Sequence, residues 1–391
     1  MINLKSIVGC AAVAACVLTA CDQKATHDME GLKSGLNPTA FDTVINKKQV
    51  KLYTLRNANG MEVDITNFGG RVVSIMVPDK EGNFQDVVLG YDNVAQYADS
   101  VNSPSDFGAA IGRYANRINK GKIELDGVKY QLATNNFGHC LHGGPSGWQY
   151  QVYDVVESND SVLKMSIDSP DGDNGFPGNV KATVTYTLTS NNALDIAFEG
   201  TTDKTTIINM TNHSYFNLSG DPTTTVLDQE LWINADKFTQ SDDTYMTTGE
   251  EVSVKDTPMD FTNQHAIGEQ INDTTFLQLK NANGYDHNWC LLTYKDGKGD
   301  DTKPCAKVFC PTTGIELTVY TSEPGIQVYT GNFLEGKVVG KKGIKYPQRS
   351  GICLESQKYP DSPNKKQWVS PVLKKDEKYN SHLVYAFSVK K

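Results

Sequence analysis

The sequence predicts an all-β sandwich, and three observations lead to this fold class. Short segments rich in Val, Ile, Thr and Tyr, partly alternating with polar residues, recur from about Asn37 to the C-terminus. Gly, which occurs 33 times, and Asn are frequent between these segments, as expected at turns. No stretch shows an extended apolar period of 3.6 residues with helix caps. Many short strands separated by turns are typical of a β-sandwich.

The expected strands follow one another along the whole chain. Examples lie within residues 61–70, 70–79, 122–132, 162–168 and 314–322. Residues 179–200 read as two strands joined by a turn at Ser190, Asn191 and Asn192, which gives a hairpin. Asp126 and Gly127 predict a second turn of this kind. Because no break or linker interrupts this pattern, we expect residues 37–391 to form a single domain, although two tandem sandwiches also fit the length.

The N-terminus has the pattern of an export signal. Lys5 precedes an apolar stretch at residues 7–18, which is too short to span a membrane stably. The following Leu-Thr-Ala-Cys ends at Cys21 and resembles a bacterial lipobox. We therefore expect a lipoprotein signal peptide at residues 1–20, a lipidated Cys21, and a polar tether through residue 36. The alternative is an ordinary signal peptide with an incidental cysteine. The lipobox implies an exported lipoprotein of a Gram-negative-type bacterium, periplasmic or anchored at the outer membrane.

Charge and cysteine content indicate which partners and which cysteine chemistry to expect. The formal net charge is −9 and no long run of Lys or Arg occurs, which argues against a nucleic-acid partner. The cysteines that would remain beside Cys21 in the exported chain are odd in number and widely scattered, so we expect free or buried thiols rather than a disulfide framework. They are Cys140, Cys290, Cys305, Cys310 and Cys353.

Several chemistries lack their motifs. No G-x-S-x-G nucleophile elbow, no phosphate-binding P-loop and no dinucleotide-binding glycine motif is present, so no nucleotide cofactor is expected. His139 and His142 are close in sequence, but no cluster at metal-ligand spacing accompanies them. We expect neither a metal ion nor another cofactor.

Six segments combine polar, chemically capable residues with strand-like surroundings. They are residues 111–118, 140–144, 209–220, 284–289, 323–332 and 351–360. In the second, two glycines after His142 would allow a tight turn beside a ligand. Each segment also has a structural explanation. Arg117 could lie on the surface, His213 could be a satisfied core histidine, Glu355 could face solvent and Asp286 could cap a turn. Spacing alone therefore does not establish a site.

Taken together, these segments resemble the aldose 1-epimerases, or galactose mutarotases. N-R-I, L-H-G-G, N-H-S-Y-F-N-L, D-H-N-W, E-P-G-I-Q-V-Y-T-G-N and E-S-Q-K-Y-P-D-S-P-N occur in the family's order, from about Thr43 to the C-terminus. The resemblance implies a large antiparallel β-sandwich of the galactose mutarotase-like (supersandwich) type. It also implies an enzyme that interconverts the α and β anomers of free hexoses such as galactose or glucose by ring opening and re-closure.

The resemblance further implies roles for individual residues. Glu355 matches the family's general base and His213 its general acid. His142 matches a further catalytic residue, the second histidine, which hydrogen-bonds the sugar and helps the ring-oxygen chemistry. Residues matching substrate contacts are Asn116, Arg117, Asp286 and Gln327. Tyr215 lies two residues after His213, so in a strand it would share that residue's face and could contact the ligand. The expected partner is a free monosaccharide, and we expect a monomer.

Three rival functions use the same residues differently. A glycoside hydrolase would employ Asp286 and Glu355 as its carboxylate pair. A non-catalytic sugar-binding lipoprotein would not need a matched acid and base, which His213 and Glu355 provide. A sugar-phosphate epimerase would need additional Arg or Lys side chains to hold the phosphate.

Overall fold

The computed structural model describes residues 31–101 and 106–390. The expected signal peptide and Cys21 lie outside these residues, as does most of the expected tether. At the C-terminal end of the expected tether, the Ser34 hydroxyl donates a hydrogen bond of 2.6 Å to Asp64. Leu36 is buried in a hydrophobic cluster. Within the described part of the chain, no helix has the length and apolar character required to cross a membrane.

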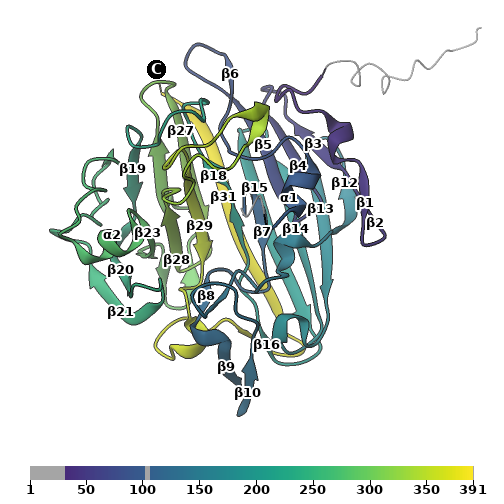
Figure 1. The fold of residues 1–391 in the computed structure, drawn as a ribbon, viewed down its shortest axis with the longest axis vertical. Coiled ribbons are helices and arrows are strands. Elements are labelled where there is room, and N and C mark those ends of the chain that lie inside the picture. The colour runs from purple at the N-terminus through teal and green to yellow at the C-terminus, as the bar shows by residue number, and fades with distance from the viewer. Residues whose placement is uncertain (1–30, 102–105, 391) are drawn as a thin grey trace, which may run out of the picture.

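A large antiparallel sheet forms one layer of the molecule (Figure 1). Its C-terminal strand, yellow in Figure 1, pairs with both the N-terminal and C-terminal halves of the sheet, so distant segments become neighbours. In spatial order the strands are β12 (Asp154–Ser158), β13 (Val162–Ser169), β14 (Val180–Leu188), β15 (Ala193–Thr202), β31 (Lys378–Val389), β27 (Ile315–Thr321), β26 (Ala306–Phe309), β19 (Glu230–Ile233) and β22 (His265–Ala266).

Two smaller sheets accompany it. The second sheet comprises β18 (Tyr215–Phe216), β29 (Ile352–Gln357), β28 (Gly325–Tyr329), β23 (Asp286–Leu291), β20 (Ala235–Ser241) and β21 (Thr247–Ser253). The third comprises β3 (Leu52–Arg56), β4 (Glu62–Thr66), β5 (Arg71–Pro78) and β6 (Phe84–Asp86). All registered strand pairs in these sheets are antiparallel, as the sequence predicts.

Short paired strands and short helices complete the fold. The strand pairs are β1 (Thr43–Ile45) with β2 (Lys48–Val50), β8 (Arg117–Ile118) with β11 (Cys140–Leu141), β9 (Lys122–Leu125) with β10 (Val128–Gln131), β7 (Ala109–Ile111) with β17 (Thr211–His213), β16 (Thr206–Ile207) with β30 (Val372–Leu373), and β24 (Tyr294–Lys295) with β25 (Lys298–Gly299). The α-helices are α1 (Val94–Ala98) and α2 (Leu277–Ala282). The 3₁₀ segments are η3 (Pro38–Phe41), η4 (Asn119–Gly121), η5 (Trp148–Tyr150), η6 (Asp173–Gly175), η7 (Lys341–Gly343) and η8 (Ser362–Asn364).

The two predicted hairpins are confirmed. β14 and β15 pair in register from Val180 opposite Thr202 to Leu188 opposite Leu194, and Asn192 adopts a φ of 60° in the turn between them. β9 and β10 are joined by Asp126 and Gly127, both with positive φ as a tight two-residue hairpin turn requires.

Alternating side chains divide the second sheet into two different faces. In β29, Ile352 and Leu354 belong to the main hydrophobic core, and Ile326 and Val328 do the same in β28. Residues between them must point to the opposite face, because successive side chains of a strand alternate. One face of this sheet therefore anchors it to the core, and the other is free to carry polar side chains.

Candidate active site

The polar face of the second sheet carries four of the predicted residues. Gln327 lies directly opposite Glu355, and Asn288 lies opposite Gln327 from the other side. Asp286 is two residues before Asn288 and therefore shares its face. Tyr215 pairs with Cys353, two residues before Glu355, which places it on the same face. Strand register alone thus brings together residues separated by up to 140 positions in the sequence.

A second wall of the site is built from short loops. Asn116 has a φ of 63°, and its Oδ1 accepts a hydrogen bond of 2.8 Å from the backbone N–H of Arg117. His142 follows β11 with a φ of 50°, and the next two residues, Gly143 and Gly144, have φ values of 80° and 92°. A Cβ on Gly143 would lie 2.2 Å from the backbone oxygen of Gly112. The tight turn that the sequence predicts after His142 is therefore present, and it requires glycine.

These two walls enclose a cleft of about 410 Å³. All eight catalytic and substrate-binding residues expected from the sequence line it: Asn116, Arg117, His142, His213, Tyr215, Asp286, Gln327 and Glu355. It is also lined by residues that sequence reasoning did not single out: Asp106, Asn136, Phe137, Leu141, Tyr245, Tyr329 and Phe333. The surface, core or turn explanations of the individual motifs therefore do not account for their convergence.

The closest acid–base pair in the cleft is formed by His213 and Glu355. His213 Nε2 lies 3.5 Å from Glu355 Oε1, and both side chains are buried. The other carboxylate oxygen of Glu355 is buried without a hydrogen-bond partner. Burial, with the nearby charges of Asp286 and Asp106, raises the pKa of Glu355 well above its usual range. Burial lowers the pKa of His213, although the Asp106 charge opposes this.

His142 is a neutral hydrogen-bond donor. Its Nδ1 accepts a hydrogen bond of 3.1 Å from the backbone N–H of Asn116. Burial and the nearby His213 and Arg117 hold the pKa of His142 well below its usual value, so the ring is neutral at pH 7. A neutral imidazole that accepts at Nδ1 carries its proton on Nε2. His142 therefore presents an N–H group, edge to face against the His213 ring at a centroid distance of 5.2 Å.

Asp286 and Arg117 provide a carboxylate and a cation on fixed supports. Gln327 Nε2 donates a hydrogen bond of 2.7 Å to Asp286 Oδ1, and burial raises the pKa of this carboxyl. The Arg117 guanidinium donates through Nε and one terminal nitrogen to Asn136 Oδ1 at 3.1 and 3.0 Å. It lies 4.9 Å from the centre of the Tyr245 ring, a cation–π distance. These contacts hold the side chains of Asp286 and Arg117 in place before a polar ligand binds.

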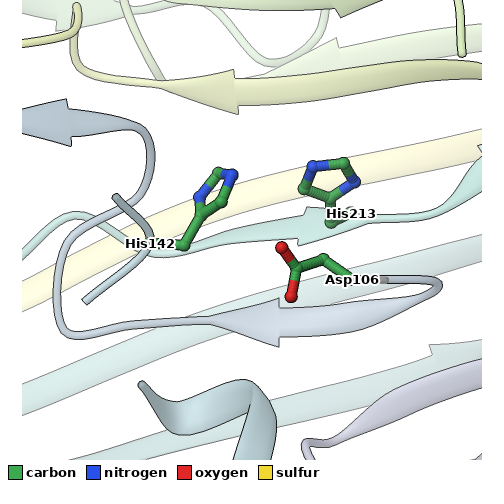
Figure 2. Close-up of side chains that lie close together, drawn as sticks. All are labelled: Asp106, His142 and His213. Carbon is green, nitrogen blue, oxygen red and sulfur yellow. The ribbon is translucent and has the colours of Figure 1, made fainter. Parts of the chain in front are cut away.

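Two groups of side chains in the described structure place potential ligand atoms within 4.8 Å of one another. Asp106, His142 and His213 form one group (Figure 2), and His213, Cys353 and Glu355 form the other. A metal ion bound at His142 Nε2 would need a lone pair where the observed hydrogen bond places a proton. Burial also raises the pKa of the Cys353 thiol well above its usual value, which opposes the thiolate that metals prefer. In the first group, the proton on His142 Nε2 is available to a hydrogen-bond acceptor in the cleft.

Comparison with known proteins gives the same picture over most of the chain. Residues 51–386 match the sequence profile of the family described as aldose 1-epimerase. The chain belongs to the aldose 1-epimerase family. It is 40% identical over 333 residues to a galactose mutarotase from Sus scrofa, covering 84% of this chain and 92% of the relative. It is 36% identical over 341 residues to the aldose 1-epimerase of Escherichia coli strain K12, covering 86% and 95%.

Solved structures of aldose epimerases share the fold. The aldose epimerase homologue from C. elegans superimposes with a TM-score of 0.80 at 31% identity, covering 88% of this chain and all of that one. The galactose 1-epimerase from Lactobacillus acidophilus gives a TM-score of 0.76 at 27% identity, covering 89% and 97%. The predicted all-β, large antiparallel fold of this family is therefore confirmed.

Other sequence-based expectations have clear outcomes. Tyr215 does share the face of His213, and their rings stack at a centroid distance of 5.1 Å and an angle of 22°. Trp148 and Trp289 are buried in the main core. The five cysteines expected to be free thiols, Cys140, Cys290, Cys305, Cys310 and Cys353, are all free and buried. His139 is satisfied by the backbone N–H of Lys120 and by the Thr244 hydroxyl.

Some lining residues of this epimerase cleft had a signal in the sequence and others did not. Tyr329 lies two residues after Gln327 in β28, so strand alternation alone could have placed it on the same face. Asp106, Phe137, Tyr245 and Phe333 come from loops or strand ends whose position depends on tertiary packing. Nothing in their local sequence distinguishes them from surface residues.

Proposed function

We propose that this chain is an aldose 1-epimerase in which Glu355 and His213 are the base and the acid. The observation that carries this assignment is the 3.5 Å separation between Glu355 Oε1 and His213 Nε2 within the cleft. In a cyclic sugar, the C1 hydroxyl oxygen and the ring oxygen are bonded to the same carbon atom. A base and an acid that are neighbours can therefore contact both oxygens of one substrate molecule simultaneously.

Ring opening then follows with balanced protons. The Glu355 carboxylate removes the proton from the C1 hydroxyl, a C1=O double bond forms, and the bond between C1 and the ring oxygen breaks. The protonated His213 gives its Nε2 proton to the departing ring oxygen. The product is the open-chain aldehyde, with Glu355 protonated and His213 neutral. Both side chains are then in the state required for the return reaction.

Re-closure on the other face of C1 gives the second anomer. Rotation about the C1–C2 bond presents the opposite face of the aldehyde to the hydroxyl group that was the ring oxygen. His213 takes the proton of that hydroxyl as it attacks C1, and Glu355 returns a proton to the aldehyde oxygen. No electrons are gained or lost over the cycle. The neutral N–H group of His142 can donate a hydrogen bond to the sugar throughout.

The opposite pKa shifts of Glu355 and His213 suit a reversible reaction. Burial raises the pKa of the carboxyl and lowers that of the imidazole, so both shifts favour transfer of the proton from His213 to Glu355 relative to the same pair in water. Such a pair titrates as a unit with two macroscopic steps, and the active form holds one proton in total.

The remaining lining groups fit a free neutral monosaccharide. Asp286 and Gln327 offer an acceptor and further amide contacts, and Arg117 and His142 offer donors, which is the mixture that sugar hydroxyls require. Galactose mutarotases are among the relatives, and we propose galactose and glucose as substrates. The exchange of pure α-D-galactose and α-D-glucose into their β anomers should be accelerated, as followed by polarimetry against a protein-free control.

A methyl glycoside separates this function from hydrolysis. Methyl α-D-galactoside has no free C1 hydroxyl, so an epimerase cannot open its ring, whereas a glycoside hydrolase would release methanol from it. We expect no change in this compound by NMR under conditions where free galactose equilibrates. Methanol release without anomer exchange of galactose would contradict the epimerase assignment and favour the use of Asp286 and Glu355 as a hydrolytic pair.

The cellular location is a separate proposal that rests on the N-terminal sequence. We propose cleavage after residue 20, lipidation of Cys21 and anchoring at the periplasmic side or the outer membrane. Expression of the full chain in a Gram-negative host should place it in the membrane fraction, with incorporation of labelled palmitate. Cys21→Ala should abolish the labelling. Labelling that persists in this variant would contradict the lipidation site. We also propose a monomer, to be checked by light scattering of the purified protein.

A further inference from the structure

Asp106 is a third carboxylate in the cleft, and it has no place in the reaction described above. It lies three residues before the start of the β7 strand, and its backbone oxygen accepts a hydrogen bond of 3.0 Å from the backbone N–H of Ala109. Ala109 pairs with His213 across β7 and β17, and Gly108 N–H donates to the His213 backbone oxygen at 3.0 Å. This pairing fixes the Asp106 backbone beside the acid. Its side chain lines the cleft, and its Oδ1 is buried without a hydrogen-bond partner.

The position of Asp106 relative to the acid and the base indicates which part of the sugar it faces. A carboxylate oxygen of Asp106 lies within 4.8 Å of ring nitrogens of both His142 and His213, and Figure 2 shows the carboxylate directed toward the two rings. Glu355 belongs instead to the second group, with Cys353, and the two groups share only His213. Asp106 therefore lies beside both histidine rings, whereas Glu355 is grouped with His213 and Cys353.

The geometry of a pyranose ring matches this arrangement. The ring oxygen is bonded to C1 and to C5, so its two flanking substituents are the C1 hydroxyl and the group carried by C5. With the C1 hydroxyl placed at Glu355 and the ring oxygen at His213, we place the C5 substituent beside Asp106 and His142, the other groups next to His213. In a hexopyranose this substituent is a hydroxymethyl group. Its hydroxyl can donate to a carboxylate and accept from the neutral His142 N–H group.

We propose that Asp106 binds the hydroxymethyl group at C5 of a hexopyranose and makes this cleft selective for neutral hexoses over sugars altered at C6. The inference rests on the proposed epimerase function and adds a substrate-selecting residue to it. A carboxylate accepts a hydrogen bond from a hydroxyl, gains nothing from a hydrogen or methyl group, and repels a second carboxylate. The Arg117 guanidinium of the same cleft is already hydrogen-bonded to Asn136 and lies against the Tyr245 ring, so these contacts do not involve Asp106.

Four sugars of galacto configuration test this directly, since they differ only in the substituent carried by C5. They are D-galactose with a hydroxymethyl group, D-fucose with a methyl group, L-arabinopyranose with hydrogen, and D-galacturonate with a carboxylate. Anomer exchange is measured by NMR with the full-length protein and with Asp106→Ala and Asp106→Asn. We expect wild-type kcat/KM to be highest for galactose and lowest for galacturonate. Asp106→Ala should lower the value for galactose by about 10- to 100-fold, the range of a hydrogen bond to a charged group.

The selectivity pattern distinguishes this role from others. Removal of the Asp106 charge also shifts the pKa values of Glu355 and His213, so each variant is compared at its own pH optimum. There, values for D-fucose and L-arabinose should change less than about 3-fold in Asp106→Ala, since neither sugar offers a hydroxyl at that position. Asp106→Asn should retain part of the galactose activity and raise the galacturonate activity, because the amide accepts a hydrogen bond without repelling a carboxylate. Melting temperatures report whether either variant is misfolded, and the D-fucose rate is an internal control for an intact acid–base pair.

Two results would overturn the inference while leaving the epimerase function intact. An equal loss on all four sugars, with a shifted pH profile, would mean that Asp106 acts only through His213. Unchanged values for galactose and galacturonate in both variants would mean that the side chain does not contact the sugar. If the proposed epimerase function is wrong, the result is different: the wild-type protein accelerates anomer exchange of none of the four sugars, and the inference about Asp106 is then also wrong.

Discussion

Replacing Glu355 by glutamine separates the activity of this protein from its stability. The amide has nearly the same shape as the carboxyl but cannot accept a proton at neutral pH. Glu355 Oε1 faces His213 Nε2 at 3.5 Å, and Oε2 is buried without a partner. The substitution therefore removes the proposed base with little change in packing. It also removes a carboxyl for which the fold provides poor solvation.

The expected loss of activity is large. A positioned general base contributes about 10²- to 10⁴-fold to a rate, or about 3 to 5 kcal/mol of transition-state stabilisation. We expect kcat for galactose anomer exchange to fall by at least about 100-fold in Glu355→Gln. Sugar binding, measured by calorimetry, should remain within a few-fold of wild type, because the other lining residues are unchanged.

The expected effect on stability has the opposite sign and depends on pH. Burial raises the pKa of Glu355 well above its unfolded value of about 4.3, so the folded state prefers the protonated carboxyl. The stability contributed by this preference is complete below the unfolded pKa and is lost as pH rises through the folded pKa. Each pKa unit is equivalent to about 1.4 kcal/mol. Glutamine has no such titration, so the thermal stability of the variant should exceed that of wild type increasingly as pH rises from 4 to 8.

Polarimetry and thermal unfolding at several pH values test both expectations. Glu62→Gln in β4 is the matched control, since Glu62 is equally buried but accepts hydrogen bonds from Arg56 Nε and the Lys33 backbone N–H. This control should keep its activity and lose stability, by about 1.5 to 3 kcal/mol. Retention of more than about a tenth of the wild-type kcat by Glu355→Gln would refute the assignment of the base. A uniform loss of stability in that variant would refute the electrostatic reasoning.

Three further predictions concern charge and backbone geometry. Asp286→Asn removes a negative charge that raises the pKa of Glu355, so the acidic limb of the pH–rate profile should move to lower pH. His382 is hydrogen-bonded to Asp195 and to a second aspartate, which raise its pKa to about 9, and NMR titration should detect this value. The folded-state pKa exceeds the unfolded value of about 6.5. The stability that His382 contributes is therefore present below pH 6.5 and is lost as pH rises through about 9. Gly143→Ala should reduce stability by more than about 2 kcal/mol and lower activity, as measured by denaturant unfolding and anomer exchange.

Each of these predictions has its own control. Gly82 has a φ of 86°, close to that of Gly143, but no atom lies within 4 Å of an added Cβ, so Gly82→Ala reports backbone strain alone. Equal effects of the two alanine variants would contradict the proposed clash with Gly112. Asp195→Asn should lower the pKa of His382, and an unchanged titration would contradict the ion pair. An acidic limb that stays in place in Asp286→Asn would show that desolvation alone sets the pKa of Glu355.

Much of the fold could be predicted because its signals are local. Alternating apolar residues identified strands such as β5 and β27, and Asp126 with Gly127 identified the β9–β10 turn. Sheet order could not be predicted in this way. β31 pairs with β15 and β27, which precede it by many residues, and such pairing depends on contacts across the whole chain. The sequence also could not predict which residues of β29 face the core and which face the cleft, because every residue of this strand is buried.

The candidate site was predicted where the residues belong to motifs and missed where only packing selects them. Glu355, His213 and His142 were named from the sequence because their surrounding motifs resemble those of a family. Asp106 lies in a loop without such a motif, and it reaches the cleft because β7 pairs with β17. Tyr245 comes from a hairpin far from Arg117 in the sequence and covers its guanidinium only in the folded chain.

By itself, the sequence determined the strand-rich class of this protein, its turns, and the chemical groups available for proton transfer. Only the tertiary structure decided that Glu355 and His213 lie 3.5 Å apart, that the ring of His142 is neutral with its proton on Nε2, and that a third carboxylate stands beside them. The physical reason is that residue type fixes what a group can donate or accept, whereas pKa values and distances arise from burial and from neighbours contributed by distant strands.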